Sequence, residues 1–446
     1  MKNYIALAAI LVAGLSLSSC KKDAANDAAP FGKRSAKAGL TYDQAALLPV
    51  KTISSDIAVG SYTFDKDTVY ELSGVITVRD GGVLNIEAGT YIKSTPNAPN
   101  VQNGVLVVSK TGTIHASGTE DSPIVFTSKR LLDNDPSTIA APGDFGGVIV
   151  LGNDTVNTVS GDKLIEGLAD LPKFHYGGNV GNDSRGELEY VRIEYAGFQL
   201  APNIEVNGLT LGGVGTGTKL DNIQVSYGLD DGFEFFGGSV NATHLIALAS
   251  DDDQFDFDNG YNGTIRFAIA VADGSATHSV SGSNSDSNGI ESDNNAPAED
   301  NTFSRTPFTN PKLSRISIIG TNGSTSVSGL GYRNGIRERR GSRIRLDSSI
   351  ITGYPRTIMF DVASTTGEAG NFSNSVITAN NSFHAFTAIS DVGLSGTVAA
   401  SASTFSLGAP FYNVSKPNLD FFNATRGGDD GWVFLTQDGG WVKFDY

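Results

Sequence analysis

LEYVRIEYAG at residues 188–197 and LDNIQVSYG at residues 220–228 are the two stretches that decide the fold. In the first, apolar Val191, Ile193 and Tyr195 occupy every second position, and charged residues stand between them. Alternation with a period of two places one set of side chains in a core and the other on the surface of a β-strand. Both stretches therefore predict short β-strands.

The spacing between similar strands indicates a repeating architecture. Aligning Val191 with Ile223 gives an offset of 32 residues, and aligning Phe233 with Phe255 gives about 22. Repeats of this length that contain strands rather than helices are typical of a solenoid, in which each coil lies on its predecessor. A β-propeller fits less well, because each blade needs about forty residues. The sequence predicts an all-β protein that forms a right-handed parallel β-helix.

Composition agrees with this fold, and the charge of the chain disfavours one class of partner. The chain of 446 residues contains 53 glycines and only 2 methionines, which argues against a helical protein. We expect the β-helix to span residues 50–400, and a capping segment that contains Trp432 and Trp441 to follow over residues 401–446. The formal net charge of −16 disfavours nucleic acid as a partner, because binding a phosphate backbone requires a basic surface.

The N-terminus has the pattern of an export signal. Residues 1–19 contain one lysine, a short apolar run and small residues, which is typical of a secretory signal peptide and too short for a transmembrane helix. The sequence LSSC at residues 17–20 resembles the lipobox of bacterial lipoproteins. Because Cys20 is the only cysteine, we expect it to carry lipid and to make the membrane a partner. Residues 20–49 are then predicted to form a flexible tether.

Several segments of the chain resemble one protein family. They lie in order between about residues 70 and 340 and read GVLVVSKTGTIHASGTEDSPIVFTS, GDFGGVIVLGN, LEYVRIEYAG, VNGLTLGGVGTGTKLDNIQVSYGLDDGFEFFGG and DDDQFDFDNGY. These segments, and the closing GWVFLTQDGGWVKFDY, are similar to Bacteroidetes-type outer-membrane β-helix lipoproteins. The resemblance implies a β-helix that is lipid-anchored at the cell outer membrane and exposed at the cell surface. It implies no reaction, because the family has no established activity.

An acidic stretch, DDDQFDFDNG at residues 251–260, contains the strongest candidate site. Alternation places Phe255 and Phe257 inside the β-helix, and Asp256 and Asp258 outside. Equivalent residues on stacked coils lie about 4.8 Å apart. The aligned coils predict one outward column of Glu234, Asp256 and Glu291, a second of Phe236, Asp258 and Asp293, and Arg337 at the end of the first column.

Carboxylates stacked in a column on the surface repel one another, and this repulsion is unfavourable for the fold unless it is compensated. Two unit charges at this spacing repel by roughly 3 kcal/mol at an effective dielectric constant of 20. Water, a shared proton, an arginine on the next coil or a divalent cation would each reduce this cost. Three interpretations of the acidic stretch therefore remain open.

In the first interpretation, the acidic residues are solvated turn residues of a tightly wound solenoid. In the second, they bind Ca²⁺ or another divalent cation that stiffens the coils or bridges to an acidic glycan. The ligands would be Glu234, Asp252, Asp256, Asp258, Glu291 and Asp293. In the third, the protein is a polysaccharide lyase or glycoside hydrolase. The catalytic carboxylates would be Asp256, Asp258, Glu291 and Asp293, and the base of a lyase would be Arg337, Arg266 or Arg333.

Our leading hypothesis for the function is non-enzymatic. The protein would be a lipid-anchored binding or structural component of the cell envelope, assisted by calcium, and its partner would be a polysaccharide or another envelope protein. The alternative hypothesis is the polysaccharide lyase or glycoside hydrolase. An active site for sugars needs aromatic platforms. Phe236, Tyr227 and Tyr261 are the candidates near the acidic stretch.

Overall fold

The structure is a computed structural model of the chain. It describes residues 39–94, 104–197, 199–201, 204–274, 276, 280–281, 284–321, 331–354, 356–360, 372–373, 376–378 and 441–443. The predicted signal peptide, Cys20 and Trp432 lie outside the described residues. Within the described part of the chain, no helix is long and apolar enough to cross a membrane.

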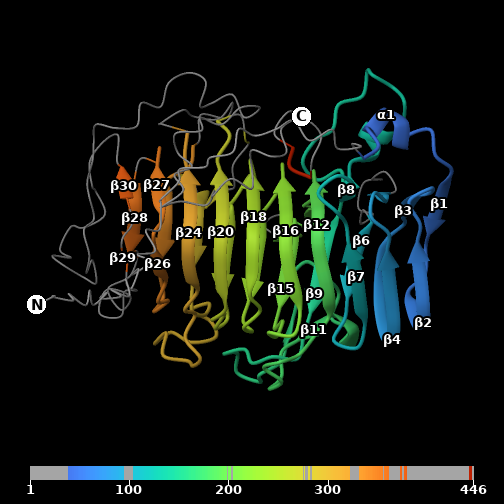
Figure 1. The fold of residues 1–446 in the computed structure, drawn as a ribbon. Coiled ribbons are helices and arrows are strands. Elements are labelled where there is room, and N and C mark those ends of the chain that lie inside the picture. The colour runs from blue at the N-terminus through green and yellow to red at the C-terminus, as the bar shows by residue number, and fades with distance from the viewer. Residues whose placement is uncertain are drawn as a thin grey trace, which may run out of the picture. The chain divides into compact units, whose positions relative to one another are not determined.

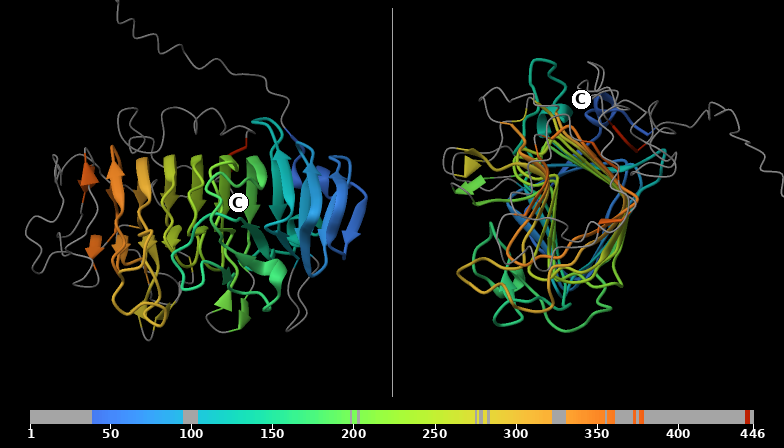
Figure 2. Two further views of the ribbon diagram at one scale, coloured as in Figure 1. Left: turned by 90° about the horizontal axis from the view of Figure 1, so that it is seen from below. Right: turned by 90° about the vertical axis from the view of Figure 1, so that its left-hand side faces the viewer.

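The described strands between Val50 and Thr378 form a right-handed parallel β-helix, as the sequence predicts. Its strands belong to one 24-stranded parallel sheet that winds around a common core (Figures 1 and 2). Hydrogen bonds join each strand to the equivalent strands of the coils before and after it. The wound sheet has three faces, which we name the site sheet, the lateral sheet and the third sheet.

The site sheet carries the acidic stretch. Its strands are the first half of β4 (Val75–Ile86), β6 (Val105–Val108), β9 (Gly147–Leu151), β15 (Leu209–Gly212), β17 (Phe233–Phe236), β19 (Phe255–Asp258), β23 (Asn288–Ser292), β25 (Asn334–Glu338) and β28 (Arg356–Phe360).

The lateral sheet lies on the next face. Its strands are β1 (Val50–Ile53), β3 (Val69–Leu72), β5 (Tyr91–Ser94), β8 (Ile124–Thr127), β12 (Gly186–Glu194), β16 (Lys219–Ser226), β18 (Ala242–Leu248), β20 (Thr264–Val271), β24 (Lys312–Ile319), β27 (Ile350–Thr352) and β30 (Val376–Thr378).

The third sheet closes the coil. It contains β2 (Ile57–Phe64), the second half of β4, β7 (Thr113–Ser117), β26 (Arg345–Asp347), β29 (Phe372–Ser373) and the first halves of the long lateral strands β12, β16, β18, β20 and β24. Each of these long strands bends between two faces. One residue of the bend has positive φ, as in Tyr190, Asn222, His244 and Phe267 at +50° to +56°. A single left-handed residue turns the strand without ending its ladder of hydrogen bonds.

The predicted register between coils is confirmed. Val191 pairs with Ile223, and Phe233 pairs with Phe255. The inward rings of Phe233 and Phe255 stack at 5.1 Å between centroids, with 9° between their planes. Inward side chains of successive coils therefore form continuous columns in the core, and outward side chains form continuous columns on the surface.

The N-terminal boundary of the folded part differs from the prediction. A short helix, α1 (Tyr42–Ala45), lies within residues 20–49, which we expected to be a tether. Thr41 caps this helix, and Ala45 is completely buried. The hydroxyl of Tyr42 donates to Glu194 of β12 at 2.8 Å. Apolar burial and this hydrogen bond fix the segment from residue 41 onward to the β-helix.

A long excursion between β9 and β12, residues 152–185, covers part of the site sheet (Figure 1). It contains the antiparallel pair β10 (Lys163–Leu164) and β11 (His175–Tyr176) and the 3-10 helix η2 (Pro172–Phe174). Its Tyr176 ring packs on Phe236 of β17 at 5.8 Å. The excursion therefore buries outward apolar residues of the site sheet under a second apolar layer.

The remaining described elements are short. They are the 3-10 helix η1 (Lys129–Leu132) and two antiparallel pairs, β13 (Gln199–Ala201) with β14 (Ile204–Glu205), and β21 (Val280–Ser281) with β22 (Asn284–Ser285).

Part of the predicted C-terminal cap lies on a side of the β-helix. Trp441 packs edge-on against Tyr190 of β12, and Gln224 of β16 bonds to the backbone N–H of Lys443 at 2.9 Å. This short segment, red in Figure 1, contacts strands in the middle of the series rather than the last coil. Trp441 is buried, as expected of a capping residue, but what it covers is the outward surface of the lateral sheet.

Candidate functional site

The predicted acidic column is present in the structure. Glu234 of β17 pairs with Asp256 of β19, and Asp256 pairs with Glu291 of β23. Glu291 then pairs with Arg337 of β25, so the arginine is at the predicted end of the column. The register predicted for Glu291 is therefore confirmed. Phe255 and Phe257 are buried, and Asp256 and Asp258 point outward and are partly exposed.

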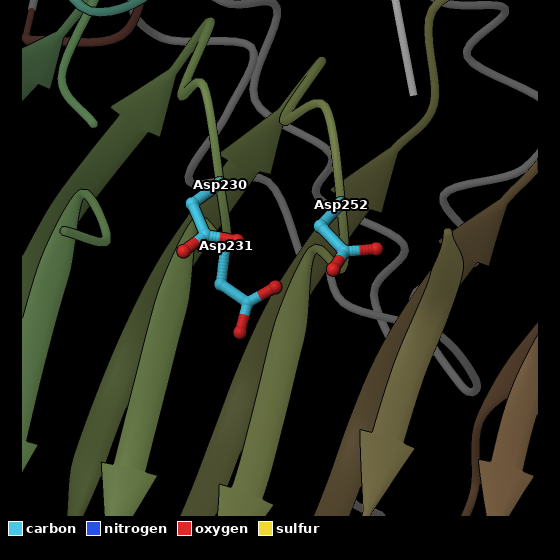
Figure 3. Close-up of side chains that lie close together, drawn as sticks. All are labelled: Asp230, Asp231 and Asp252. Carbon is cyan, nitrogen blue, oxygen red and sulfur yellow. The ribbon is translucent and has the colours of Figure 1, made fainter. Parts of the chain in front are cut away.

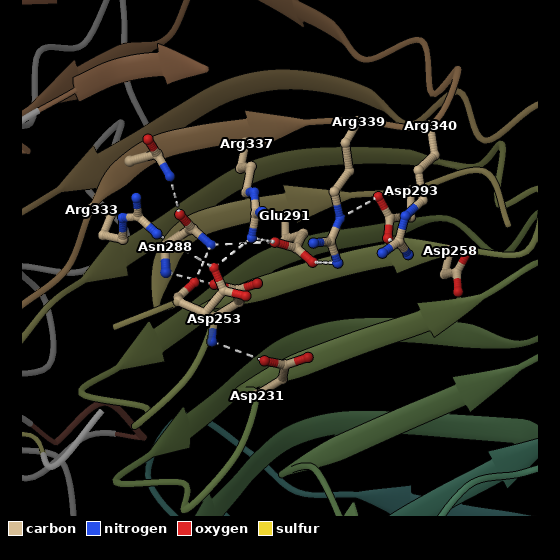
Figure 4. A network of polar contacts seen from close by, with 12 residues as sticks. Asp231, Asp253, Asp258, Asn288, Glu291, Asp293, Arg333, Arg337, Arg339 and Arg340 are labelled. Carbon is tan, nitrogen blue, oxygen red and sulfur yellow. Dashed lines mark hydrogen bonds and ion pairs between the residues drawn. The ribbon is translucent and has the colours of Figure 1, made fainter. Parts of the chain in front are cut away.

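Arginines neutralise one end of this acidic surface. Arg337 contacts Glu291 at 3.0 Å, and Arg339 contacts Asp293 at 2.6 Å and also Glu291. Arg340 contacts the other oxygen of Asp293 at 2.5 Å (Figure 4). We name this group of two carboxylates and three arginines the paired half. Its carboxylates, which we predicted as metal ligands, are bound by guanidinium groups.

The other end has a different composition. Carboxylate oxygens of Asp231, Glu234 and Asp256 lie within 4.8 Å of one another. Those of Asp253, Asp256 and Glu291 also lie within 4.8 Å, so Asp256 belongs to both groups. We name Asp231, Glu234, Asp253 and Asp256 the unpaired half. Among the residues that the structure describes, none of these four forms an ion pair with lysine, arginine or histidine.

A third acidic group lies at the turn before these strands. Asp230 and Asp231 follow each other in one coil, and Asp252 lies at the same turn of the next coil (Figure 3). Their carboxylate oxygens also lie within 4.8 Å of one another. Asp252 is therefore at the candidate site, as predicted, but it is grouped with Asp230 and Asp231 rather than with the column.

A ladder of turn residues explains why Asp231 and Asp253 lie in the interior. The side-chain oxygen of Asn207 accepts the backbone N–H of Asp231 at 3.2 Å. Asp231 accepts the N–H of Asp253 at 2.8 Å, and Asp253 accepts the N–H of Asn288 at 2.5 Å. The last rung links Asn288 and Asn334 through their side chains at 2.5 Å. Each ladder residue thus supports the next coil, and all five are buried.

The sequence contains a signal for this ladder that the alternation of apolar residues does not reveal. Each ladder residue stands two positions before an inward apolar residue, in NGL, DGF, DQF, NGI and NGI. Three of the five ladder residues are asparagines, and the other two are Asp231 and Asp253. The same hydrogen bond to the next coil needs only one acceptor oxygen, which either residue provides. The two aspartates therefore add charge that the ladder does not require.

Glu166 was not predicted either, because it belongs to the distant excursion. Its carboxylate accepts from the side-chain amide of Asn207 at 3.2 Å, and the same amide donates to Glu234. Glu234 is only 5% exposed as a result. The first interpretation, in which the acidic residues are solvated, is therefore wrong for Glu234, Asp231 and Asp253.

Burial raises the pKa of the carboxyl groups in this region. It raises the pKa of Asp258 to about 7 and of Glu291 to about 8, and neighbouring carboxylates reinforce both shifts. Burial together with the surrounding negative charge raises the pKa of Asp231, Glu234, Asp253 and Asp256 well above the usual range. The unpaired half therefore holds protons at neutral pH or requires another cation.

The residues of the unpaired half fit a divalent cation. Hard cations such as Ca²⁺ bind through carboxylate oxygens at about 2.3–2.6 Å. The Oδ1 atom of Asp256 is inaccessible to solvent and has no hydrogen-bond partner among the described residues, and Asp256 is the residue that both carboxylate groups share. A buried acceptor in this state is costly unless a ligand satisfies it.

Other predicted residues lie away from the site or are covered. Arg266 belongs to the third sheet, in the first half of β20, where its guanidinium lies over the ring of Phe267 at 5.1 Å. Arg333 is near the site and contacts Asp286 at 4.0 Å. Tyr261 is completely buried in the core, and Tyr176 covers Phe236. Neither Tyr261 nor Phe236 is therefore a platform for sugars.

Comparisons with known proteins agree with the fold. A family described as the pectate-lyase-like β-helix domain matches residues 55–407. No curated protein matches the chain. The enzymatically active domain of tailspike protein 2 from bacteriophage CBA120 is similar over 70% of this chain and 38% of its own, with 14% identity and a TM-score of 0.35.

The catalytic unit of a thermostable GH87 alpha-1,3-glucanase from Streptomyces thermodiastaticus strain HF3-3 is similar over 72% of this chain and 53% of its own. The identity is 14% and the TM-score 0.31. The chain thus spans about half or less of each of these solved structures.

Proposed function

The chain belongs to the family of pectate-lyase-like β-helix domains, and we propose that it cleaves a polysaccharide at the acidic surface of the site sheet. The single observation that supports this proposal is the unpaired half, a group of carboxylates that lacks compensating charge and is open to solvent at Asp256 and, beside it, at Asp258. Such an arrangement is unfavourable for stability alone. Perturbed carboxyl groups of this kind are typical of functional sites.

Asp258 is suited to donate a proton to the leaving oxygen of a glycosidic bond. Its pKa of about 7 keeps a large fraction of the group protonated near neutral pH, and a general acid works best when its pKa lies near the working pH. It is also partly exposed, whereas Glu291 and Asp293 are buried beneath arginines. Asp258 and Asp256 are therefore the two carboxyl groups of this face that a sugar can reach.

A divalent cation fits the oxygens of Asp231, Glu234 and Asp256. When bound there, it would supply positive charge that attracts an acidic sugar and polarises its carboxylate. The protein residues themselves keep the carboxylates in place, because the ladder fixes Asp231 and the strand register fixes the other two.

The test is incubation of the purified protein with neutral and anionic polysaccharides, with calcium or with chelator. New reducing ends without unsaturated ends indicate hydrolysis, and unsaturated ends indicate elimination. We expect cleavage that Asp258→Asn and Asp256→Asn abolish while both variants stay folded. The matched control is Asp67→Asn, an exposed carboxylate outside the site sheet.

A second candidate function is supported by the burial of Glu234, Asp231 and Asp253. Ligands this deep suit a cation that stiffens the coils of a protein that binds polysaccharide, or another envelope protein, without cleaving it. In that case the assay above would give saturable binding and no new ends with any substrate.

We also propose that the protein is exported and anchored at the cell outer membrane through lipid on Cys20, with its β-helix at the cell surface. The support is the apolar leader and the LSSC sequence at residues 17–20. Cys20→Ala should move the protein from the membrane fraction to the soluble fraction. Equal membrane content of this variant and the wild type would contradict the anchor.

A further inference from the structure

The outward face of the lateral sheet is apolar and buried in the middle of the β-helix. Inward residues of β18, β20 and β24 fill the core, and the residues that alternate with them point outward. An outward side chain of a single-layered solenoid stays in solvent unless a second layer covers it. Five outward apolar side chains are nevertheless at most 3% exposed; they are Ile246, Leu248, Ile269, Val271 and Ile319. A second layer therefore covers this face.

The third sheet, which contains the first halves of the same strands, faces solvent. Its outward residues are polar, and Arg266 of β20 and Lys312 of β24 are exposed. The outward residues thus change from exposed and polar to buried and apolar at the bend of each strand. One half of each strand suits water, and the other half suits an apolar partner.

The chain leaves the lateral sheet at its last described coil and returns to it near the middle. Thr378 ends β30 in the lateral sheet. Trp441 contacts β12, where its carbonyl accepts from Arg192 at 3.5 Å. Five steps of the ladder separate β30 from β16, the neighbour of β12, and at about 4.8 Å for each step they span about 24 Å. The chain on both sides of residues 379–440 thus lies on the face that carries the buried apolar columns.

The composition of residues 379–440 suits this face. They contain seven phenylalanines and Trp432, with only two basic residues, Lys416 and Arg426. Residues 20–38, which precede the described chain, contain one aromatic residue, Phe31, and five basic residues. Apolar columns are stabilised by apolar side chains that leave water with them. The C-terminal segment is therefore the better occupant.

A buried ion pair at the end of this face contacts both ends of the described chain. Nε of Arg192 and Oε1 of Glu194 lie 2.8 Å apart, and their side chains are 8% and 0% exposed. The hydroxyl of Tyr42 in α1 donates to Glu194 at 2.8 Å. Arg192 donates to the carbonyl of Trp441 from the same pair. Helix α1 and the C-terminal end of the chain thus share one buried pair of charges.

Gln224 of β16 fixes the C-terminal backbone beside this pair. Its side-chain oxygen accepts the N–H of Lys443 at 2.9 Å, and its amide group donates to the carbonyl of the same residue. The ammonium group of Lys443 also lies over the ring of Tyr42 at 5.5 Å. We name the residues that join the two ends the clasp; they are Tyr42, Arg192, Glu194 and Gln224.

We infer that the outward face of the lateral sheet is a docking surface for the chain's own C-terminal segment, residues 379–440, and that the clasp locks this segment to helix α1. The apolar columns bind the segment, and the clasp fixes the place where it ends. The inference is independent of the proposed function. It leaves the site sheet and the third sheet as the faces that an external partner can reach.

The first test places the photo-cross-linking residue benzoylphenylalanine at Ile319 of the full chain, on the buried half of β24. The matched control has it at Lys312, on the exposed half of the same strand. Mass spectrometry of tryptic peptides then identifies the residues that are joined. We expect the Ile319 variant to form cross-links within residues 379–440 on a chain of unchanged mass, and the Lys312 variant to form none there. If the Ile319 variant fails to fold, Ile269 of β20 takes its place.

Three results would overturn the docking surface. The first is a cross-link from Ile319 to a second copy of the chain, seen as a doubled mass on a denaturing gel. The second is a cross-link to residues 1–38. The third is a folded Ile319 variant that forms no cross-link within residues 379–440, or no more than the Lys312 variant forms.

The second test measures the lock by limited proteolysis of the full chain. Within residues 379–440, Pro417 protects Lys416 from trypsin, so Arg426 is the cleavage site. Tyr42→Phe should raise the rate of cleavage after Arg426 roughly tenfold, because a hydrogen bond to a buried carboxylate is lost and cleavage follows local release of the segment. The control is Tyr62→Phe, a half-buried tyrosine of β2. Equal cleavage rates in the two variants would show that α1 does not lock the segment.

Discussion

The paired half and the unpaired half occupy neighbouring coils of one sheet, yet they resolve the same electrostatic problem differently. In the paired half, Glu291 and Asp293 are buried and form ion pairs with three arginines. Three of these ion pairs have N–O distances of 2.5–3.0 Å, and Arg339 forms a further ion pair with Glu291. In the unpaired half, Glu234 and Asp256 continue the same column without a cation from the described chain. Both halves have the same strand geometry. They differ in whether the next coil provides an arginine or another carboxylate.

This comparison separates a structural role from a functional one. A buried carboxylate with a complete set of partners is explained by the fold that it helps to hold. A buried carboxylate without a compensating cation lowers stability and persists only when something else stabilises it. The ion pairs of the paired half therefore account for its buried carboxylates. The carboxylates of the unpaired half require a ligand or bound protons.

The largest expected effect is in the paired half. Arg339→Ala leaves Glu291 and Asp293 buried with one fewer cation, and breaking a buried pair from one side costs about 3–5 kcal/mol. We expect the free energy of unfolding, measured by urea denaturation, to fall by this amount. Arg266→Ala removes an arginine from the third sheet and should cost less than about 1 kcal/mol. Equal losses in the two variants would show that the pairing does not stabilise the acidic surface.

The next effect concerns the unpaired half. Calcium at about one hundred times its Kd should raise the free energy of unfolding by about 2.7 kcal/mol if it binds only the folded chain. Asp256→Asn should remove most of this gain, because Asp256 belongs to both carboxylate groups. Asp293→Asn should keep it, since its carboxylate is bound by arginines. Thermal melting with increasing calcium measures both responses, and a flat titration of the wild type would rule out the cation.

The sequence predicted the part of the site that follows from strand geometry. The period of two and the alignment of coils placed Glu234, Asp256, Glu291 and Arg337 in one column, and the structure confirms that column. The same reasoning gave the fold, because each coil repeats the pattern of its predecessor.

Other features could not be derived in this way. Asp231 and Asp253 lie in turns, where no period of two applies, so only their fixed distance from an inward residue marks them. Glu166 and Tyr176 reach the site from an excursion whose docking depends on tertiary packing. The burial of Glu234 follows from that docking, and local pattern does not encode it.

The pH dependence of stability distinguishes protons from metal at the acidic surface. In chelator, Asp258 has a pKa of about 7 and Glu291 of about 8 when folded, above the ordinary values of 3.8 and 4.5. Between the ordinary and the raised pKa values, these two groups hold more protons in the folded state than in the unfolded state. Stability therefore falls as the pH rises from about 4 to 8. Each such group contributes up to about 1.4 kcal/mol per pH unit.

Burial also raises the pKa of the four carboxyl groups of the unpaired half, which therefore add to this pH dependence, and calcium should reduce their part because a bound cation favours the ionised carboxylates. Urea denaturation at a series of pH values, with calcium or with chelator, measures the two slopes. Identical slopes in both buffers would contradict cation binding by these groups, and stability that rises with pH in chelator would contradict their protonation.

The smallest expected effect tests the two aspartates of the ladder. Asp231→Asn keeps the oxygen that accepts the backbone N–H of Asp253 at 2.8 Å and removes the negative charge beside Glu234 and Asp256. In chelator we expect the free energy of unfolding to rise by about 1 kcal/mol, because on folding Asp231 must take up a proton or keep a repulsive charge, and asparagine does neither. In saturating calcium the sign should reverse relative to the wild type, since a ligand is lost. If the variant is less stable by a similar amount in both buffers, the second oxygen of Asp231 acts as a hydrogen-bond acceptor rather than as a ligand. If it is unchanged in both, the charge at this rung has no role in stability, and the contrast with the paired half disappears.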